Sequence, residues 1–466
     1  MDRRTFLSGV SAAPLLSAQA RGQGQDYTPE GDRPPNILFL LFDKCRSDAI
    51  GAYGERDVHT PNLDFLAETG VLFNNCYVPQ ALCGPTRASI LTGSYSHVHG
   101  LKRNVYPHSP GTGNSTYQEP IIDPFRDQRF RLWDNFGFYL NNAGYATGHI
   151  GKWHLGPTNP GFFDYWKSFN SLLLHWIGEP HKSRYRPDVH TDQGLRFLDD
   201  HSDEPFFLYQ SYYSPHEPSD PPKHFLEHYK GQSNAGYYGS VSALDWNVGR
   251  ILDKLREKGV LDDTMIIFST EHGRAWTDRP GTVEGMCTSY DDAARIPLMI
   301  RYPKRLPSGK VWESGVSSVD LMPTILDAAG IVPIMGAHGN DFRPVIHGRS
   351  LFKEVNEGRD DWSRPIMIQN VPQRAIGGSF YEERGLRTEQ FKIILRKYGN
   401  RPAMRPGELY DMKADPGETR NLWDSSGSTV KQMATKVRDW GEEHDDDLSI
   451  DLGVMGDGKQ LDRIVL

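Results

Sequence analysis

The chain has 466 residues and a formal net charge of -8, with 37% hydrophobic and 24% charged residues. This length allows a large core and more than one domain, and the composition is that of a globular protein with no basic excess, which argues against nucleic acid as the main partner. No run of about 20 apolar residues occurs, so we expect no membrane span in the mature protein.

Residues 1–20 have the features of an export signal. The twin arginine Arg3-Arg4 precedes a modest apolar stretch, and Ala18-Gln19-Ala20 offers a small-residue cleavage site. We therefore expect twin-arginine export to the periplasm or the extracellular medium; the alternative is a disordered basic tail. This route carries folded proteins.

Two apolar runs predict buried strands that end in acidic residues. Asn36–Phe42 fits a strand buried on both faces of a parallel sheet, and Asp43 follows it. Met265–Ser269 is a second such run and leads to Glu271 and His272. Ligands bind beyond the carboxyl ends of strands in open α/β sheets. The three side chains therefore predict a cation site with oxygen ligands and one imidazole, although each acid alone could be an ordinary loop residue.

The stretch from Cys83 to Gly93 predicts a reactive thiol at the start of a short helix. Pro85 suits the first turn of a helix and Gly93 is a natural stop. Cys83 is then expected just ahead of the helix N-terminus, which favours an anion, and Arg87 lies one turn in, where its guanidinium can lean back. The alternative is a structural cysteine beside a capped helix. Separately, Cys45 could form a disulfide with Cys76.

Two further strands lead to basic residues. Tyr145–Ile150 runs into Lys152 and His154, which point to the same side if the chain is extended, so that one could hold an anion while the other moves a proton. The alternative is a solvated lysine beside a core tryptophan. Pro205–Tyr213 is followed by His216 between prolines, which would present this histidine at the sheet edge.

The pattern changes in the last quarter of the chain. Residues 316–330 predict a helix ended by glycine, and a linker follows. Residues 386–388 and 391–396 predict hairpin partners, and Ser428–Glu443 predicts an amphipathic helix with Ser428 as its N-cap. The acidic tail 444–447 is expected to be solvated.

These elements predict an α/β fold with a large, mostly parallel sheet flanked by helices. We assign a catalytic domain to residues 34–345. Residues 350–466 are expected to form a smaller C-terminal α+β subdomain built on an antiparallel sheet. The sequence predicts no oligomeric state.

The motifs together resemble the type I, formylglycine-dependent sulfatases of the alkaline phosphatase superfamily. The resemblance includes Cys-x-Pro-x-Arg with Thr-Gly after a short helix, and it extends from about Asn36 to Leu422. It implies that a maturation enzyme oxidises Cys83 to formylglycine, whose hydrate attacks sulfur with one hydroxyl and expels sulfate with the other. It also implies a divalent cation, with Ca²⁺ expected and Mn²⁺ as the alternative. The expected metal-binding residues are Asp43, Cys83, Glu271 and His272.

The resemblance also implies roles for the other residues. Arg87 and the cation would hold and activate formylglycine, Lys152 would bind sulfate, His154 would be the base that expels sulfate, and His216 would protonate the leaving oxygen. The implied activity is hydrolysis of sulfate monoesters, with a sulfated saccharide as substrate. The alternatives are a phosphodiesterase or phosphonate monoester hydrolase of the same superfamily, and a catalytically silent sugar-binding relative.

Two residues depart from the family pattern. Lys44 stands where the family has a second acidic residue, and an ammonium group cannot bind a metal. Met286 stands where many relatives have a lysine that contacts sulfate. Either Lys44 supplies part of the missing positive charge, or it points to solvent and the metal is held by fewer ligands.

Overall fold

The structure is a computed structural model that describes residues 33–54, 57–105, 123–127, 129–178, 184–275, 285–333, 345–371, 382–397 and 407–456. The expected export signal at residues 1–20 lies outside these ranges. No helix in the described part of the chain is long and apolar enough to cross a membrane.

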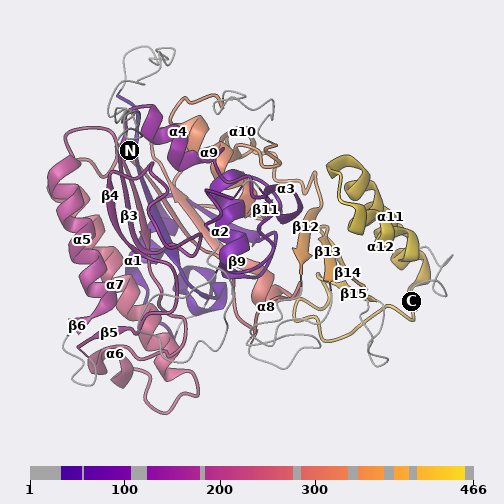
Figure 1. The fold of residues 1–466 in the computed structure, drawn as a ribbon. Coiled ribbons are helices and arrows are strands. Elements are labelled where there is room, and N and C mark those ends of the chain that lie inside the picture. Colours follow the sequence, from indigo (N-terminus) through magenta and orange to yellow (C-terminus); the bar gives the residue numbers. More distant parts are fainter. Residues whose placement is uncertain are drawn as a thin grey trace, which may run out of the picture.

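A nine-stranded sheet forms the centre of the larger part of the molecule, in the order β10-β2-β9-β8-β1-β7-β3-β4, with β11 paired to β2 (Figure 1). Its strands are β1 (Asn36–Phe42), β2 (Val71–Tyr77), β3 (Ala146–Lys152), β4 (Tyr165–Phe169), β7 (Phe206–Ser211), β8 (Thr264–Thr270), β9 (Arg295–Arg301), β10 (Lys310–Trp312) and β11 (Val316–Ser317). Strand β1 pairs in parallel with both β7 and β8, whereas β9 is antiparallel to β8 and β2.

Helices cover both faces of this sheet, and short helices also lie in the connections between its strands. They are α1 (Pro61–Thr69), α2 (Cys83–Thr92), α3 (Ser96–His99), α4 (Phe136–Asn142), α5 (Arg186–His201), α6 (Lys223–Glu227), α7 (Ala235–Glu257), α8 (Asp291–Ala294), α9 (Leu321–Ala328) and α10 (Leu351–Glu357). Short 3₁₀ helices are η1 (Ser47–Ala49), η2 (Gly51–Tyr53) and η3 (Ser318–Asp320), and β5 (Trp176–Ile177) pairs with β6 (Arg184–Tyr185).

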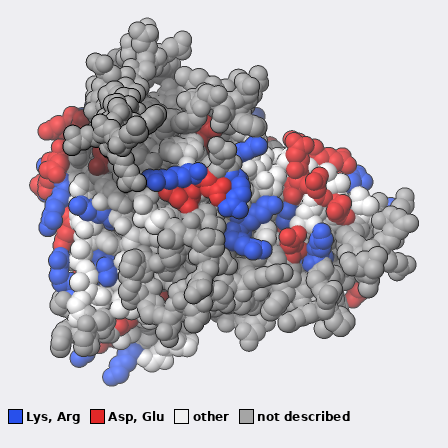
Figure 2. All heavy atoms as spheres, in the orientation of Figure 1, with Lys and Arg blue, Asp and Glu red and all other residues white. Residues whose placement is uncertain are grey.

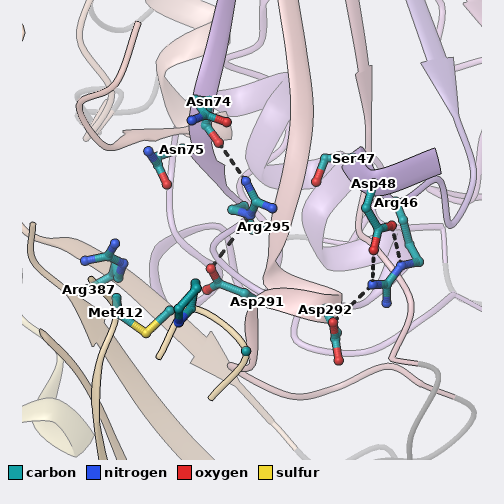
Figure 3. A pocket seen from close by; sticks show the side chains of 12 residues that line it. Arg46, Ser47, Asp48, Asn74, Asn75, Asp291, Asp292, Arg295, Arg387 and Met412 are labelled. Carbon is teal, nitrogen blue, oxygen red and sulfur yellow. Dashed lines mark hydrogen bonds and ion pairs between the residues drawn. The ribbon is translucent and has the colours of Figure 1, made fainter. Parts of the chain in front are cut away.

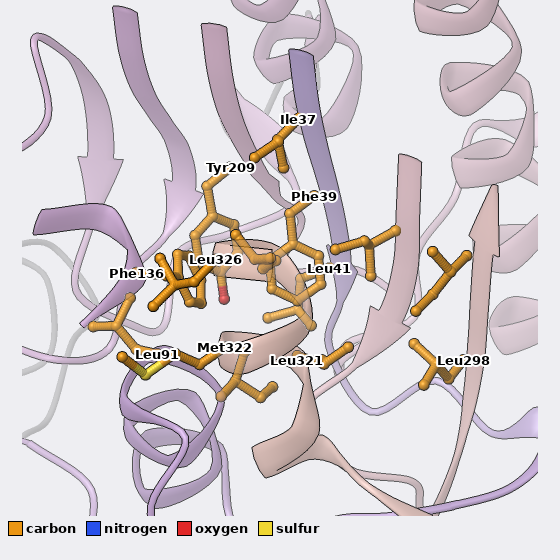
Figure 4. Packing of buried hydrophobic residues seen from close by; sticks show 14 of the residues in the cluster. Ile37, Phe39, Leu41, Leu91, Phe136, Tyr209, Leu298, Leu321, Met322 and Leu326 are labelled. Carbon is orange, nitrogen blue, oxygen red and sulfur yellow. The ribbon is translucent and has the colours of Figure 1, made fainter. Parts of the chain in front are cut away.

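The alternation of side chains along β1 explains why this strand is apolar throughout. Ile37, Phe39 and Leu41 pack with residues of α2, α4 and α9 on one face (Figure 4). Leu38, Leu40 and Phe42 pack with residues of α1, α5 and α7 on the other face. Each buried side chain of this size contributes about 1.5–3 kcal/mol of transfer free energy. Both faces of the strand must therefore be hydrophobic, as in other parallel sheets covered on two sides.

A four-stranded antiparallel sheet in the order β12-β13-β14-β15 lies beside the large one (Figure 1). Its elements are β12 (Ile366–Asn370), β13 (Glu382–Arg387), β14 (Phe391–Lys397) and β15 (Gly407–Asp411), followed by α11 (Gly427–His444) and α12 (Asp447–Gly456). The two helices cover one face through an apolar cluster. Figure 2 shows acidic side chains gathered at this end of the molecule, with basic side chains beside them. The predicted α/β fold with a smaller antiparallel sheet is confirmed.

Several local predictions differ from the structure. The helix expected over 316–330 begins only at Leu321, because Val316 and Ser317 pair with β2 and a capping box joins Ser317 to Asp320. Helix α11 begins at Gly427 with Ser426 at the N-cap position, so Ser428 lies inside it.

The prediction of a solvated acidic tail is wrong for one of its residues, and the possible disulfide is not formed. In the acidic tail, Asp446 is buried and forms an ion pair with Arg384 of β13, since the turn after α11 brings it back onto the sheet. Cys45 and Cys76 are both buried free thiols and do not form a disulfide.

Candidate active site

The carboxyl ends of adjacent strands bring the predicted residues together. Strands β8, β1, β7 and β3 are consecutive in the sheet. Glu271, Asp43 and His216 lie just after β8, β1 and β7, and Lys152 is the last residue of β3. The register therefore delivers acids and bases from distant parts of the chain to one edge of the sheet.

Four buried side chains form a cluster that could hold a metal ion. The ligand atoms of Asp43, Cys83, Glu271 and His272 all lie within 4.8 Å of one another. Asp43 Oδ1 and Glu271 Oε1 are buried and accept no hydrogen bond from any residue in the described part of the chain. Burial without a donor is costly for a carboxylate oxygen, so these atoms fit a cation better than a closed polar core.

The imidazole of His272 has the tautomer that such a site requires. Its Nδ1 lies 2.8 Å from the carbonyl oxygen of Gly273, which can only accept, so Nδ1 carries the hydrogen. Burial lowers the pKa of His272 and keeps the ring neutral. Its Nε2 lone pair then points to the cluster, 3.1 Å from Cys83 Sγ.

Two cations neutralise the carboxylates from the other side. Lys152 Nζ contacts Asp43 and lies 3.8 Å from Glu271 Oε1, and Arg87 Nη2 lies 3.1 Å from Glu271 Oε2. Burial alone would raise the pKa of Asp43, but Lys152, His216, Glu271 and Arg87 together outweigh it, and the pKa falls well below its ordinary value. At Glu271 burial dominates and raises the pKa well above its ordinary value. A bound cation would favour the ionised form of both groups.

Helix α2 positions the nucleophile candidate and Arg87. Cys83 is the first residue of the helix rather than the residue before it, Pro85 lies in the first turn, and Gly93 ends the helix with φ 65°. The Arg87 Nη1 donates to Lys152 O at 2.7 Å and to Ser211 Oγ at 2.8 Å. Arg87 thereby ties the helix to the ends of β3 and β7.

Residues from other parts of the fold hold the segment before Cys83. The Ala81 N–H donates to Asn370 Oδ1 at 3.1 Å, and the Cys287 N–H donates to Ala81 O at 2.8 Å. No sequence pattern indicated that Asn370 contacts the segment before Cys83, because Asn370 belongs to β12 of the smaller sheet, far along the chain from Cys83.

His154 is buried near the start of α2. A Cβ added to Gly84 would lie 3.3 Å from the carbonyl oxygen of His154, so the two backbones are close. His154 has φ 57°, in the left-handed region. The chain from Lys152 to His154 is therefore not extended, and the argument that placed both side chains on one side does not apply here.

His216 lies next to this cluster, on an aromatic ring. It stacks on Tyr213 at a centroid distance of 4.6 Å, and Lys152 Nζ lies 5.0 Å from the centre of the same ring. Its Nδ1 lies 2.9 Å from the carbonyl oxygen of Glu217 and therefore carries a hydrogen. Burial and the charge of Lys44 lower the pKa of His216 to about 3, so the free ring is neutral and Nε2 has a lone pair.

The structure also places the two residues that depart from the family pattern. Lys44 is 1% exposed and donates from Nζ to Glu217 Oε2 at 3.0 Å, so the alternative of a solvent-facing lysine is wrong. Met286 is buried in an apolar cluster with Leu82 and Cys287, directly beside the residue that precedes Cys83. This position supplies no charge to an anion.

A separate cavity of about 430 Å³ lies between η1, β2, α8 and the smaller sheet (Figure 3). Its charges are largely paired with one another: Arg46 with Asp48 and Asp292, and Arg295 with Asp291. None of the predicted catalytic or metal-binding residues lines this cavity. The candidate active site is therefore the buried cluster at the strand ends.

The family follows from comparison with known proteins. The family described as Sulfatase matches residues 35–331. The chain belongs to the sulfatase family. A second match, to the C-terminal region described as N-sulphoglucosamine sulphohydrolase, covers residues 286–443 of this sulfatase.

Two relatives agree with this assignment, and solved structures share the fold. The N-acetylglucosamine-6-O-sulfatase of Bacteroides thetaiotaomicron is 26% identical, over 86% of this chain and 85% of its own length. The N-acetylgalactosamine-6-sulfatase of Canis lupus familiaris is 30% identical, over 72% and 70%. The sulfatase yidJ of Bacteroides fragilis has the same fold, with a TM-score of 0.73 at 22% identity, over 94% of this chain and 100% of that one. A phosphonate monoester hydrolase of Agrobacterium radiobacter also shares the fold, with a TM-score of 0.68 at 21% identity, over 88% and 96%.

Proposed function

We propose that this sulfatase hydrolyses a sulfate monoester of a saccharide, with formylglycine made from Cys83 as nucleophile and one divalent cation. The observation that carries the proposal is the buried cluster around Cys83, in which two carboxylate oxygens have no hydrogen-bond donor among the described residues and one imidazole presents a lone pair. The cation would be bound by Asp43, Cys83, Glu271 and His272. Their oxygen-rich donor set favours Ca²⁺, with Mn²⁺ as the alternative.

A saccharide is the substrate class that the relatives support. Two of them are named as sulfatases of 6-sulfated N-acetylhexosamines, and a structure of the same fold was determined with D-glucosamine-2-N,6-O-disulfate, with a TM-score of 0.69 at 23% identity. We therefore propose N-acetylhexosamine sulfates as the first substrates to test.

The residues around the cluster have distinct roles in this proposal. When bound, the cation would draw charge from the ester and favour an ionised nucleophile. Arg87, fixed by Ser211 and the Lys152 carbonyl, orients the residue at position 83. The Lys152 ammonium neutralises charge on the sulfate oxygens. His216 delivers a proton to the leaving oxygen. His154 removes the proton of the second hydroxyl of the formylglycine hydrate, and this deprotonation allows sulfate to leave.

The nucleophile can be tested directly by mass spectrometry. A formylglycine-generating maturation enzyme should convert Cys83, so its peptide should lose sulfur and gain an aldehyde. The variants Cys83→Ala and Arg87→Ala should both lose turnover, whereas only the first should lack the aldehyde. An active enzyme with wholly unmodified Cys83 would refute the mechanism.

The choice between ester classes requires a kinetic comparison, because the phosphonate monoester hydrolase shares the fold. We expect kcat/KM for saccharide sulfates to exceed that for matched phosphate mono- and diesters. The reverse order would favour a phosphodiesterase or phosphonate monoester hydrolase. Binding of sulfated saccharides without turnover by the converted protein would indicate a silent sugar-binding relative.

We also propose export through the twin arginine of residues 1–20. Replacing Arg3 and Arg4 with lysine should keep the protein in the cytoplasm, as measured by cell fractionation. Unchanged export of this variant would contradict the proposal.

A further inference from the structure

Glu217 lies between two cations at the exposed side of the active site. Lys44 Nζ donates to its Oε2 at 3.0 Å, and Arg274 Nη1 lies 2.6 Å from its Oε1. We call Lys44, Glu217 and Arg274 the rim triad. Its members follow β1, β7 and β8, which are adjacent strands, so the triad spans the same sheet edge as the metal-binding cluster.

Exposure increases from the metal-binding cluster to the rim triad. The side chains of Asp43 and Lys152 are 0% and 1% exposed, that of His216 is 14% exposed, and that of Glu217 is 36% exposed. Of Asp43, Glu217 and Glu271, Glu217 is the one that solvent reaches. It directly follows His216, which would protonate the leaving oxygen. The saccharide would therefore meet Glu217 as it leaves the sulfate.

The carboxylate of Glu217 retains capacity to accept hydrogen bonds. Burial alone would raise its pKa, but Lys44, His216 and Arg274 lower it to about 2. Oε2 accepts from Lys44 and has His216 Nδ1 at 3.3 Å, whereas Oε1 contacts Arg274. A carboxylate offers about four acceptor positions, and among the described residues Lys44, Arg274 and the backbone N–H of Glu217 itself occupy three, so the carboxylate can accept one more hydrogen bond.

We propose that Glu217 is a specificity-determining residue that accepts a hydrogen bond from the saccharide hydroxyl nearest the sulfated carbon. This inference rests on the proposed hydrolysis of saccharide sulfates. Lys44 and Arg274 act as positioning residues that hold the carboxylate ionised and oriented. Because an ionised carboxylate only accepts hydrogen bonds, it selects a free hydroxyl at this place and disfavours a second sulfate or a uronic carboxylate. Lys44 thus serves the leaving saccharide through Glu217 and does not replace the sulfate-contacting lysine absent at Met286.

The first test compares Glu217→Gln on two substrates. The probes are N-acetylglucosamine 6-sulfate or N-acetylgalactosamine 6-sulfate, whichever the enzyme prefers, and 4-nitrophenyl sulfate, which has no hydroxyl. A hydrogen bond to a charged group corresponds to about 10- to 100-fold in kcat/KM. We expect a loss of this size on the saccharide, carried mainly by KM, and a loss at least about 10-fold smaller on the aryl ester. Glu227→Gln, a surface acid paired with Lys223, is the matched control. Equal losses on both substrates would overturn the proposal.

A double variant separates recognition from charge balance. If Glu217 only neutralises the buried Lys44, then Lys44→Met combined with Glu217→Gln should restore saccharide hydrolysis. In a hexosamine 6-sulfate, the hydroxyl nearest the sulfated carbon is the one on C4. If Glu217 binds this hydroxyl, the double variant stays impaired, and a substrate that lacks the hydroxyl (the 4-deoxy sugar sulfate) is hydrolysed by wild type and Glu217→Gln at similar kcat/KM. Restoration would overturn the proposal.

Binding of the desulfated saccharide tests the site without turnover. Calorimetry should show about 10-fold weaker binding to Glu217→Gln than to wild type. If no sulfate ester is hydrolysed, the proposed function fails but this measurement still decides the role of Glu217. Equal binding by the two proteins would overturn that role.

Discussion

Replacing Asn370 with alanine should destabilise the protein and also slow its reaction. Asn370 is fully buried; its Oδ1 accepts from the Ala81 N–H at 3.1 Å, and its Nδ2 donates to Ser289 Oγ and Glu383 Oε1, each at 3.0 Å. The substitution leaves the buried Ala81 N–H without its acceptor, which costs about 1–3 kcal/mol. Ser289 and Glu383 keep the hydrogen bonds between them, so losing the two hydrogen bonds from Asn370 Nδ2 adds only about 1 kcal/mol. We expect the free energy of unfolding to fall by about 2–4 kcal/mol.

The reaction should be affected because Ala81 precedes Cys83 by two residues. A nucleophile displaced by about 1 Å can lose about 10²-fold in rate, so we expect kcat/KM to fall by about this factor. The rate is measured per mole of converted Cys83, at a urea concentration and temperature where the variant is folded. This normalisation separates misplacement of the nucleophile from failure to mature.

Asn135→Ala is the matched control. Asn135 is equally buried, and its side chain also makes one acceptor and two donor hydrogen bonds, with Phe138 N at 2.9 Å, Leu132 O at 2.8 Å and Trp133 O at 3.0 Å. Urea unfolding should show similar losses of stability for both variants, but kcat/KM should fall only for Asn370→Ala. Full activity of Asn370→Ala, or an equal loss for both variants, would refute the positioning role.

Three further outcomes are expected. His216→Gln should lower hydrolysis of saccharide sulfates by about 10²–10⁴-fold and that of aryl sulfates much less. Because burial and Lys44 lower the pKa of His216 to about 3, the protonated fraction of this histidine falls as pH rises. We therefore expect kcat/KM for saccharide sulfates to decrease from about pH 5 to about pH 8 in wild type but not in the variant. Burial would raise the pKa of Asp446, but the hydrogen bonds and charge of Arg384, together with Ser449 and His97, outweigh burial and lower the pKa to about 2. Asp446→Asn should therefore cost about 2 kcal/mol in urea unfolding at pH 7, and this difference should shrink as pH falls from about 4 towards 2, whereas a constant difference would contradict the reasoning. Removal of the cation with a chelator should abolish activity and lower Tm, because the free energy of unfolding falls by about 2.7 kcal/mol where the ion had been at 100 times its Kd. The chelator should lower the Tm of Asp43→Asn by less, and an identical decrease in Tm would exclude Asp43 as a ligand.

The sequence by itself determined the strands and the residues at their ends. An unbroken apolar run such as Asn36–Phe42 is stable only when both faces are covered, and that requirement predicts a parallel sheet with helices on two sides. Once the strands are parallel, their carboxyl ends meet, so the sequence alone predicts that Asp43 and Glu271 lie together. The turn chemistry of Pro85 and Gly93 likewise bounded the helix that carries Cys83 to within two residues.

Only the tertiary structure decided which side chains from distant parts of the chain contact these residues. The direction of Lys44 depends on its left-handed φ of 57°, which sequence patterns do not specify, and the same holds for His154. Asn370 reaches Ala81 only because the smaller sheet packs beside the start of α2, and Asp446 is buried only because α11 turns back onto β13. The spacing of hydrophobic residues and the capping residues indicate the local backbone conformation. These contacts instead depend on how separate elements pack against each other, so no local pattern in the sequence predicts them.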